Sequence, residues 1–472
     1  MRFRHALGIA CLPLLASLAC QGTAPAPKAP ETRSGQDATT FFQTEVKDPY
    51  RWLEDGSSAE VKDWIRAQNE HAESVLGSFP DGKEIAERVR QLATTSPVRS
   101  AARMSGGVLF FLRETPPQPT PVLVAQKWPG GEERTIVDVN SEGGHQVITD
   151  YWPSPSGGRV AYGTAEGGSE LTTIHFLDVE TAKPFADPLP YAGGGTSPPA
   201  LAWDPDEGGV IYMRFPIPAA GQPMSQFDAA LFHHSFDPST PDADALGKDY
   251  SHIAEYRLLT SADGKQMAAL AKKGDGGPWD VFLRTGDGWN HALDGSAGVT
   301  TASYAGDRLL VVATAGTPNG RILALTPDGK QSELLAEGDE SIESVAPIGD
   351  GFLVVHCWGP DWRVDQYDPT GAVVRQVPLP KEGIQIAQIA SQAGADTALI
   401  AYSGWTTPGT WVSYDGRTGK TETVFEVKPA ADYSKVRMDR IEAKSKDGTT
   451  LPVVVLSLNR NEGSGPAPAI LT

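Results

Sequence analysis

Residues 150–183 read DYWPSPSGGRVAYGTAEGGSELTTIHFLDVETAK, and this stretch decides the fold. It predicts a short strand, a Ser-Gly-Gly turn, a second strand over Arg159–Gly163, a Gly-Gly loop and a longer alternating strand over Leu171–Asp178. Four short strands in about 45 residues are the size of one propeller blade. One blade cannot bury both of its faces alone, so several copies have to stack around an axis to make a core.

The same unit recurs along the chain. A turn followed by an apolar run returns roughly every 50 residues between about Val98 and Val427. Seven units fit, so the predicted fold class is all-β, a seven-bladed β-propeller over residues 95–435; six or eight blades remain compatible with the same turns. The turns are Ser105-Gly106, Ser156-Gly157, Asp206 to Gly209, Asp263-Gly264, Gly306-Asp307, Asp350-Gly351 and Gly394 to Asp396.

A short helical arm is predicted over residues 46–94, before the blades. Ser57 and Glu60 form a capping-box pattern that opens a helix running to about Leu76, and Asp81 and Glu84 open a second helix. Apolar residues fall on one face of each helix, so both faces need a partner. They are Val61, Trp64, Ile65, Ala72, Val75 and Leu76 in the first helix, and Ile85, Val89 and Leu92 in the second.

Residues 436–472 no longer show the repeated four-strand pattern. The strands Val436 to Lys444 and Thr449 to Leu458, joined by the Asp447-Gly448 turn, predict a β-hairpin. A loop then leads to Pro468–Thr472, which reads as the start of an apolar strand.

Residues 1–20 have the pattern of a signal peptide. Arg2 and Arg4 supply the positive end, and the apolar run Leu7 to Ala19 is short. The run ends in Ser17-Leu18-Ala19-Cys20, which resembles a bacterial lipobox with Cys20 as the lipidated residue; a plain secretory signal with an incidental cysteine is the alternative. Residues 21–45 read as an extended polar tether. We therefore expect a lipoprotein of the bacterial cell envelope, periplasmic or in the outer membrane, that meets the membrane only through its lipid anchor.

Composition excludes one class of partner. The 472 residues carry a formal net charge of −19, and no basic stripe is present to neutralise phosphates, so nucleic acid is not expected. The three cysteines are Cys11, Cys20 and Cys357. Removal of the signal and acylation of Cys20 leave Cys357 alone, so no disulfide framework is expected.

Catalytic patterns are missing from these residues. No G-x-S-x-G occurs: Ser296 in DGSAG lacks the first glycine, and Ser169 in GGSEL lacks the last. His233-His234 is the only histidine pair, and adjacent strand residues point to opposite faces, so shared metal ligation is not expected. Glu54-Asp55 precedes a helix, where carboxylates act as caps. We therefore predict no catalytic, metal or cofactor residue.

Several short motifs, in order along nearly the whole mature chain, resemble the prolyl oligopeptidases, a family of post-proline serine peptidases. They are DPYRWLED (48–55), AQN (67–69), AYG (161–163), GS (168–169), AW (202–203), PG (408–409) and KDGT (446–449) with Pro452. The resemblance implies that the propeller is inserted between a helical arm and an α/β-hydrolase domain, that residues 436–472 are the first strands of that domain, and that peptides are the substrates. Pro198 stands where the family has an aromatic residue of its proline pocket.

The resemblance also locates what is missing. The family's oxyanion-hole tyrosine and its Ser, Asp and His triad lie beyond the position of Thr472. We therefore expect the propeller portion of a prolyl oligopeptidase-like serine peptidase, which gates peptide access to a hydrolase domain absent here or encoded separately, and which is inactive alone. The alternative is a non-catalytic propeller lipoprotein that binds peptides or proteins.

Overall fold

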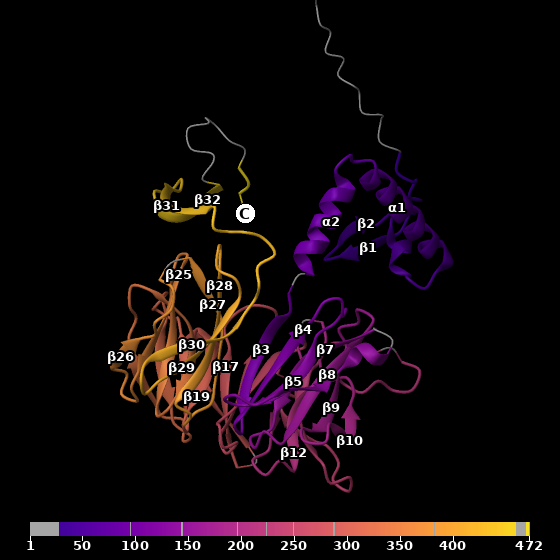
Figure 1. Ribbon diagram of the computed structural model, residues 1–472. Helices are drawn as coiled ribbons and strands as arrows, with labels where there is room; N and C mark the ends of the chain where they lie inside the picture. Colours follow the sequence, from indigo (N-terminus) through magenta and orange to yellow (C-terminus); the bar gives the residue numbers. More distant parts are fainter. Residues whose placement is uncertain are drawn as a thin grey trace, which may run out of the picture. The chain divides into compact units, whose positions relative to one another are not determined.

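The computed structural model describes residues 28–94, 96–142, 145–195, 197–222, 224–248, 250–286, 288–381, 383–458 and 469–471. The chain divides into two compact units, residues 1–93 and 94–472, and each is described by itself. Figure 1 follows both units along the sequence.

The first unit is a small helical arm with a hairpin in front of it. Its elements are the strands β1 (Ala38–Phe41) and β2 (Thr44–Lys47), the 3-10 helix η1 (Arg51–Glu54), and the helices α1 (Ala59–Gly77) and α2 (Gly82–Ala93). The strands pair antiparallel around the two left-handed residues Phe42 and Gln43.

The structure differs from the predicted tether over the described part of residues 21–45. Trp64 Nε1 donates to Thr32 Oγ1 at 3.0 Å, and Trp52 Nε1 donates to the Arg33 carbonyl at 2.8 Å. The two indole rings pack edge to face with centroids 6.4 Å apart. Because a half-buried indole N–H needs an acceptor, the polar segment before the hairpin is held against α1. The first helix thus has a neighbour that its apolar pattern could not reveal.

The predicted capping box at Ser57 is wrong. The residue before α1 is Ser58, whose side chain makes no capping hydrogen bond. Ser57 instead donates to Asp55 Oδ1 from both its backbone nitrogen (3.1 Å) and its hydroxyl (2.6 Å). A carboxylate competes well for these donors, so the serine closes a turn at Asp55 rather than the helix end.

The apolar face of α2 lies open within the first unit. Ile85, Val89 and Leu92 are 61%, 58% and 42% exposed. Leu76 and Phe79, at the junction of the two helices, are also exposed. The expectation that these faces need a partner therefore applies to α2 more strongly than to α1, where Val61 is buried.

The second unit contains seven four-stranded antiparallel sheets, each made of four consecutive strands that pair in chain order. The predicted seven-bladed β-propeller is confirmed. Blades 1 to 3 contain β3 (Val98–Ser105), β4 (Val108–Glu114), β5 (Val122–Lys127), β6 (Glu133–Val137); β7 (Gln146–Pro153), β8 (Arg159–Glu166), β9 (Thr173–Asp178), β10 (Lys183–Leu189); and β11 (Leu201–Trp203), β12 (Gly209–Arg214), β13 (Ala230–Ser235), β14 (Ala243–Leu246).

Blades 4 to 7 follow the same pattern. They contain β15 (Glu255–Thr260), β16 (Met267–Lys272), β17 (Asp280–Thr285), β18 (Gly288–Leu293); β19 (Val299–Ala305), β20 (Arg308–Ala313), β21 (Arg321–Leu325), β22 (Gln331–Leu335); β23 (Ser341–Ile348), β24 (Gly351–Trp358), β25 (Asp361–Tyr367), β26 (Val373–Gln376); and β27 (Ile384–Ser391), β28 (Thr397–Gly404), β29 (Thr410–Asp415), β30 (Lys420–Glu426). Two 3-10 turns, η2 (Val139–Glu142) and η3 (Gly295–Ala297), lie between strands.

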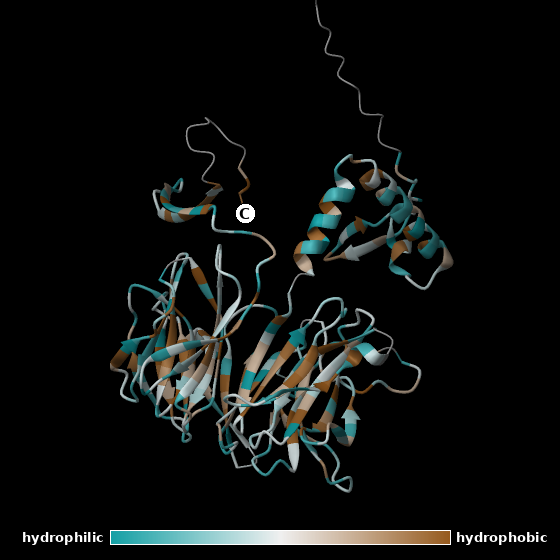
Figure 2. Cartoon of the chain, in the orientation of Figure 1, coloured by the Kyte–Doolittle hydropathy of each residue, from teal (hydrophilic) through white to brown (hydrophobic). Residues whose placement is uncertain are grey.

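Seven hydrophobic clusters hold the ring together, and each lies between two neighbouring blades. Phe110 of blade 1 and Tyr151 of blade 2 share one of them, for example, and both are fully buried. Figure 2 shows the apolar residues concentrated on the strands of these sheets. Each blade therefore buries its two faces against its neighbours, as the repeat pattern requires.

No strand of the described residues is shared between blade 1 and blade 7. The first and last blades, drawn in purple and in orange to yellow in Figure 1, meet through side chains instead. Their shared cluster contains Leu109 and Phe111 from blade 1 and Leu399 and Trp411 from blade 7. We call this junction the 1/7 seam.

The predicted hairpin after the propeller is present as β31 (Val436–Lys444) and β32 (Thr450–Leu458). Arg440 of β31 pairs with Asp361 of blade 6 and lies 5.9 Å from the Trp358 ring. Ala469–Leu471 are not in a strand, so the described part of the predicted 468–472 strand start is not observed. In the part of the chain that the structure describes, no helix is long and apolar enough to cross a membrane.

Candidate functional site

The innermost strands of the blades surround a cavity of about 440 Å³. Residues from six of the seven blades line it, mainly at the ends of β3, β15, β19, β23 and β27. The lining mixes small polar residues with aliphatic ones; it includes Ser105, Ser261, Ser303, Gln388, Leu259, Ala302 and Ile389. A pocket formed by the inner edges of the blades marks the central channel of the propeller as the candidate functional site.

Five of the innermost strands carry a β-bulge, a one-residue insertion in the strand. The register slips at Ala101 in β3, Thr149 in β7, Thr300 in β19, Glu343 in β23 and Ala387 in β27. A bulge leaves its extra residue unpaired and turns its side chain out of the ladder. Four of these residues are exposed, and Ala101 is half-buried. Most of them are small, and none of the five is among the residues that line the cavity.

The β15 strand of blade 4 differs from the bulged strands, because it pairs with β16 without a register break. Leu259 lines the cavity, and Arg257 lies two residues earlier on the same side of β15. Arg257 is exposed, as is Glu343 on β23. Two opposite charges thus belong to the inner strands of blades 4 and 6.

Among the described residues, Arg103 is the charged side chain that lines the cavity, and it belongs to an ion pair. Arg103 Nη2 lies 2.7 Å from Asp150 Oδ1, which joins blade 1 to blade 2. Next to this pair, the Tyr151 hydroxyl donates to the Phe110 carbonyl at 3.0 Å and also contacts the Ala101 carbonyl. Burial of the phenol raises the pKa of Tyr151, so the ring stays neutral.

Polar contacts cross the 1/7 seam close to the same cavity. The Ala102 backbone nitrogen donates to Gln388 Oε1 at 2.8 Å, and Gln388 Nε2 donates back to the Ala102 carbonyl at 2.6 Å. Arg99 lies 4.2 Å from the Phe425 ring centroid and 5.0 Å from that of Phe111. Burial lowers the pKa of Arg99.

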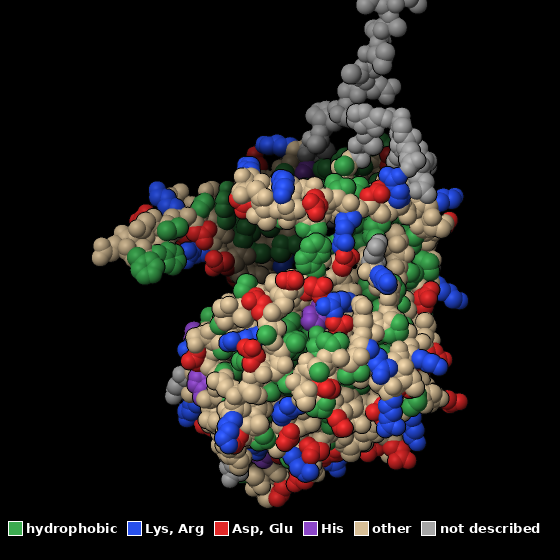
Figure 3. All heavy atoms as spheres, turned by 90° about the vertical axis from the view of Figure 1, so that its left-hand side faces the viewer, with side chains coloured by type: hydrophobic (Ala, Val, Ile, Leu, Met, Phe, Trp, Pro, Cys, Tyr) green, Lys and Arg blue, Asp and Glu red, His purple; other side chains and the backbone are tan. Residues whose placement is uncertain are grey.

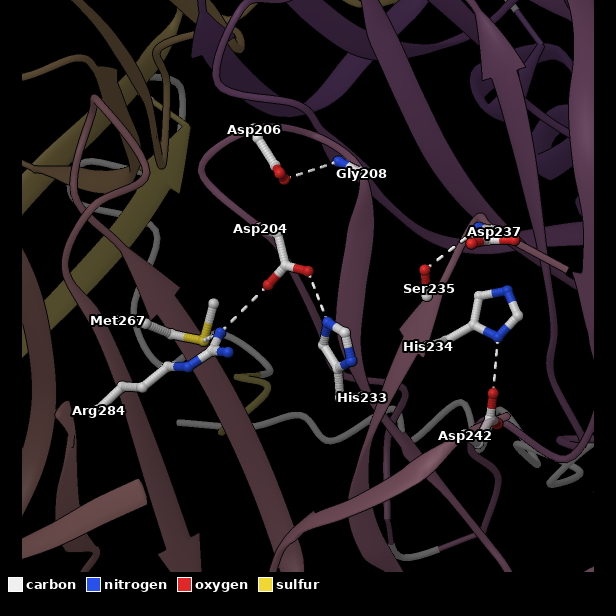
Figure 4. A network of polar contacts seen from close by, with 10 residues as sticks. All are labelled: Asp204, Asp206, Gly208, His233, His234, Ser235, Asp237, Asp242, Met267 and Arg284. Carbon is white, nitrogen blue, oxygen red and sulfur yellow. Dashed lines mark hydrogen bonds and ion pairs between the residues drawn. The ribbon is translucent and has the colours of Figure 1, made fainter. Parts of the chain in front are cut away.

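His233 and His234 do not share a ligand site. Figure 4 shows them on opposite faces of β13: His233 Nε2 contacts Asp204 Oδ2 at 2.6 Å, whereas His234 Nδ1 contacts Asp242 Oδ1 at 2.7 Å. The two rings point to opposite faces of the strand, as its period of two residues predicts. Asp204 also pairs with Arg284 of the next blade at 3.2 Å, so this network joins blades 3 and 4.

The two serines singled out in the sequence lie in turns. Ser296 is exposed in η3, where its backbone nitrogen donates to Asp294 Oδ1 at 2.8 Å. The Ser169 hydroxyl accepts from the Leu171 nitrogen at 3.1 Å in the loop before β9. Both have the structural role that their glycine-rich surroundings indicate.

The remaining predicted residues fall in three places. Asp55 caps the turn described above, and its hydrogen bonds with Ser57 lower its pKa. Cys357 is a free thiol at the end of β24. Cys20 lies outside the described residues. Sequence reasoning missed the channel residues; the only available signal was an exposed polar residue, such as Arg257 or Glu343, inside an otherwise apolar strand.

The motifs that carry the family resemblance hold the fold together. Trp52 and Gln68 bind the backbone of Arg33 and Pro30 in the arm. Trp203 Nε1 donates to the Trp152 carbonyl at 2.9 Å and so ties blade 3 to blade 2. The KDGT motif forms the turn between β31 and β32. Pro198 is exposed just before β11.

Charged side chains are interspersed over the visible face of the propeller. Figure 3 shows Lys and Arg beside Asp and Glu on this face, without an extended area of one sign. The net charge of −19 is therefore not gathered into a single patch there.

Comparison with known proteins agrees with the fold. The model of the N-terminal β-propeller domain of prolyl oligopeptidase matches residues 30–427. The prolyl endopeptidase of Elizabethkingia meningoseptica is 24% identical over 459 residues, which cover 94% of this chain and 63% of that protein. The dual function macrocyclase-peptidase of Galerina marginata is 21% identical over 485 residues, covering 93% of this chain and 66% of that protein.

Solved structures show the same architecture. A prolyl endopeptidase structure superimposes with a TM-score of 0.80 at 24% identity and covers 92% of this chain and 64% of that one. Prolyl oligopeptidase B from Galerina marginata, bound to a 25-residue macrocyclisation substrate, gives a TM-score of 0.79 at 19% identity, covering 93% and 66%. The chain thus spans about two thirds of the length of these relatives. It belongs to the prolyl oligopeptidase family and carries that family's N-terminal β-propeller domain.

Proposed function

We propose that this propeller admits peptides, and excludes folded proteins, at the entrance to a serine-peptidase active site carried by an α/β-hydrolase domain. In this proposal β31 and β32 belong to the start of that domain, and the triad comes from residues outside the 472. The relatives are peptidases by name, and one solved structure holds a 25-residue substrate. We restrict the substrate class to peptides, because Pro198 stands where the resemblance expects an aromatic proline-pocket residue.

The observation that carries the proposal is the cavity that the inner strands of the blades surround. Its volume of about 440 Å³ suits a few residues of extended chain. A folded domain of 100 residues, with a radius of gyration of about 13 Å, cannot enter such a space. Small side chains among the lining residues, such as Ser105, Ala302 and Ser303, leave room in the cavity for a peptide backbone.

A side chain that fills the channel tests this proposal. Ser303→Trp puts an indole at a position of β19 that lines the cavity, and Ser332→Trp makes the same change on β22, the outermost strand of the same blade. We expect Ser303→Trp to weaken the binding of a fluorescent peptide of about ten residues by tenfold or more, because the indole occupies the peptide's space. Fluorescence anisotropy with the whole chain gives both dissociation constants. Equal affinity of the Ser303→Trp and Ser332→Trp proteins would exclude the channel as the binding site.

We also propose that the protein is a lipoprotein of the bacterial cell envelope, anchored through Cys20. The support is the sequence alone: a basic end, a short apolar run and Ser-Leu-Ala-Cys at residues 17–20. Stable anchoring requires more than one acyl chain, as a lipoprotein cysteine provides. Cys20→Ser should move the protein from the membrane fraction to the soluble fraction. Unchanged fractionation of the Cys20→Ser protein would leave the plain secretory signal as the better account.

A further inference from the structure

Arg257 is an exposed arginine on the inner strand β15. Side chains two residues apart on a strand point to the same side and lie about 7 Å apart. Leu259 lines the channel cavity, and Arg257 lies on the same side of β15, two residues beyond the part of the strand that lines the cavity. The unbroken β15–β16 ladder keeps this spacing, whereas a bulge interrupts it on β19, the inner strand of the neighbouring blade 5.

The guanidinium of Arg257 is held in place from one side. Its carbon lies 4.8 Å from the ring centroid of Trp279, which is only 3% exposed. The Trp279 backbone is itself bridged to Val299 of blade 5, through a nitrogen-to-carbonyl hydrogen bond of 3.1 Å. A cation stacked on an anchored indole loses little further freedom when it binds a ligand.

The charge of Arg257 is not compensated. Lys272 lies over the same indole at 4.4 Å, but its Nζ pairs with Glu255 at 3.5 Å. Within the residues that the structure describes, no carboxylate pairs with Arg257. The Arg257 side chain is exposed, so its five N–H donors remain available to a ligand.

We propose that Arg257 is a binding site for a carboxylate group of a peptide inside the channel. This rests on the proposed function, because the ligand reaches Arg257 only if peptides enter the propeller. Planar guanidinium groups match carboxylates through two parallel hydrogen bonds. Glu343, on the inner strand of blade 6, carries the opposite charge and disfavours a carboxylate near its own side of the ring.

Three forms of one neutral, N-acetylated peptide of about ten residues provide the test. The first has a free C-terminal carboxylate, the second a C-terminal amide, and the third an amide with one internal Glu. With the whole chain, we expect a carboxylate form to bind about tenfold more tightly than the plain amide, and this preference to shrink as salt rises. The first and third forms distinguish a terminal from a side-chain carboxylate.

Arg257→Gln should remove the preference and leave the affinity for the amide unchanged. Glu343→Gln should keep or increase the preference for the carboxylate form. Lys420→Gln deletes the same unit charge on the outermost strand β30, and it should leave that preference unchanged. Thermal melts of each variant serve as the control for folding.

Two results would overturn the inference while the proposed function stands: amide and carboxylate forms that bind the original chain equally, or an Arg257→Gln protein that keeps the preference. Absence of binding by every peptide form would instead defeat the proposed function, and this inference with it.

Discussion

His356 lies buried inside blade 6, with its Nε2 atom 3.1 Å from the Tyr367 hydroxyl and 3.8 Å from Asp365 Oδ2. Burial, and then the positive charge of Arg363, lower the pKa of His356 to about 4; Glu340 acts in the opposite direction. The imidazole is therefore neutral in the folded protein at neutral pH. An unfolded chain has no such burial, and its histidine takes up a proton near pH 6.5.

This difference predicts a loss of stability in mild acid. Because the folded pKa is depressed, the stability linked to His356 is present above pH 6.5 and is lost as the pH falls toward 4. At pH 5 the loss is about 2 kcal/mol relative to pH 7. His356→Gln should flatten this part of the pH profile, measured as the free energy of unfolding in urea. Parallel profiles for the two proteins would show that His356 is not the titrating group.

At the scale of the element, the 1/7 seam is the place where the ring depends on side chains. Gln388→Ala removes both hydrogen bonds to Ala102, which is 3% exposed, and leaves a buried N–H and a buried carbonyl without partners. We expect a cost of about 1–3 kcal/mol in the free energy of unfolding. Hydrogen exchange should rise first in β3 and β27, which face each other across the seam.

Gln385→Ala is the matched control, since Gln385 is exposed on the same strand. A Gln388→Ala protein as stable as the Gln385→Ala protein would mean that the apolar cluster alone closes the ring.

The turns of the blades are the part of the fold that could be predicted from the sequence. Ser105-Gly106 and Ser156-Gly157 were predicted as equivalent turns of successive units, and in the structure they touch. A Cβ atom on Gly106, whose φ is +55°, would lie 1.8 Å from the Ser156 carbonyl oxygen. Two independent features require glycine at position 106: the positive φ angle, and the close approach of the next blade. A positive φ recurs at Gly264, Gly306 and Gly394, where the turns of other blades also carry glycine. Recurrence of this backbone angle is why the number of blades could be predicted.

The candidate site could not be predicted in the same way. A bulge shifts the side-chain alternation by one residue, and nothing in the local sequence at Thr300 or Glu343 distinguishes a bulge from a regular strand. The contacts of Trp64 with Thr32 and of Gln388 with Ala102 join residues far apart in the chain. Periodicity describes one element at a time, so it reveals neither the channel nor the packing of residues 28–37.

At the scale of the whole molecule, seven similar interfaces around one axis make both the core and the channel. Each blade contributes its inner strand to the axis and its faces to two hydrophobic clusters. Different parts of each sheet therefore stabilise the ring and line the channel. The faces of the sheets pack the blades together, while the inner edges remain free to contact a ligand. We propose that a peptide occupies these inner edges.

Photo-crosslinking tests that claim most directly. A peptide of about ten residues with a central benzophenone group is bound to the whole chain and irradiated, and the attachment sites are located by mass spectrometry. We expect the crosslinks on the inner strands, around the cavity-lining residues Ser105, Ser303 and Gln388, and their loss when unlabelled peptide is added in excess. Crosslinks gathered on the outermost strands β6, β14 or β30, or on the helices of the arm, would contradict the account.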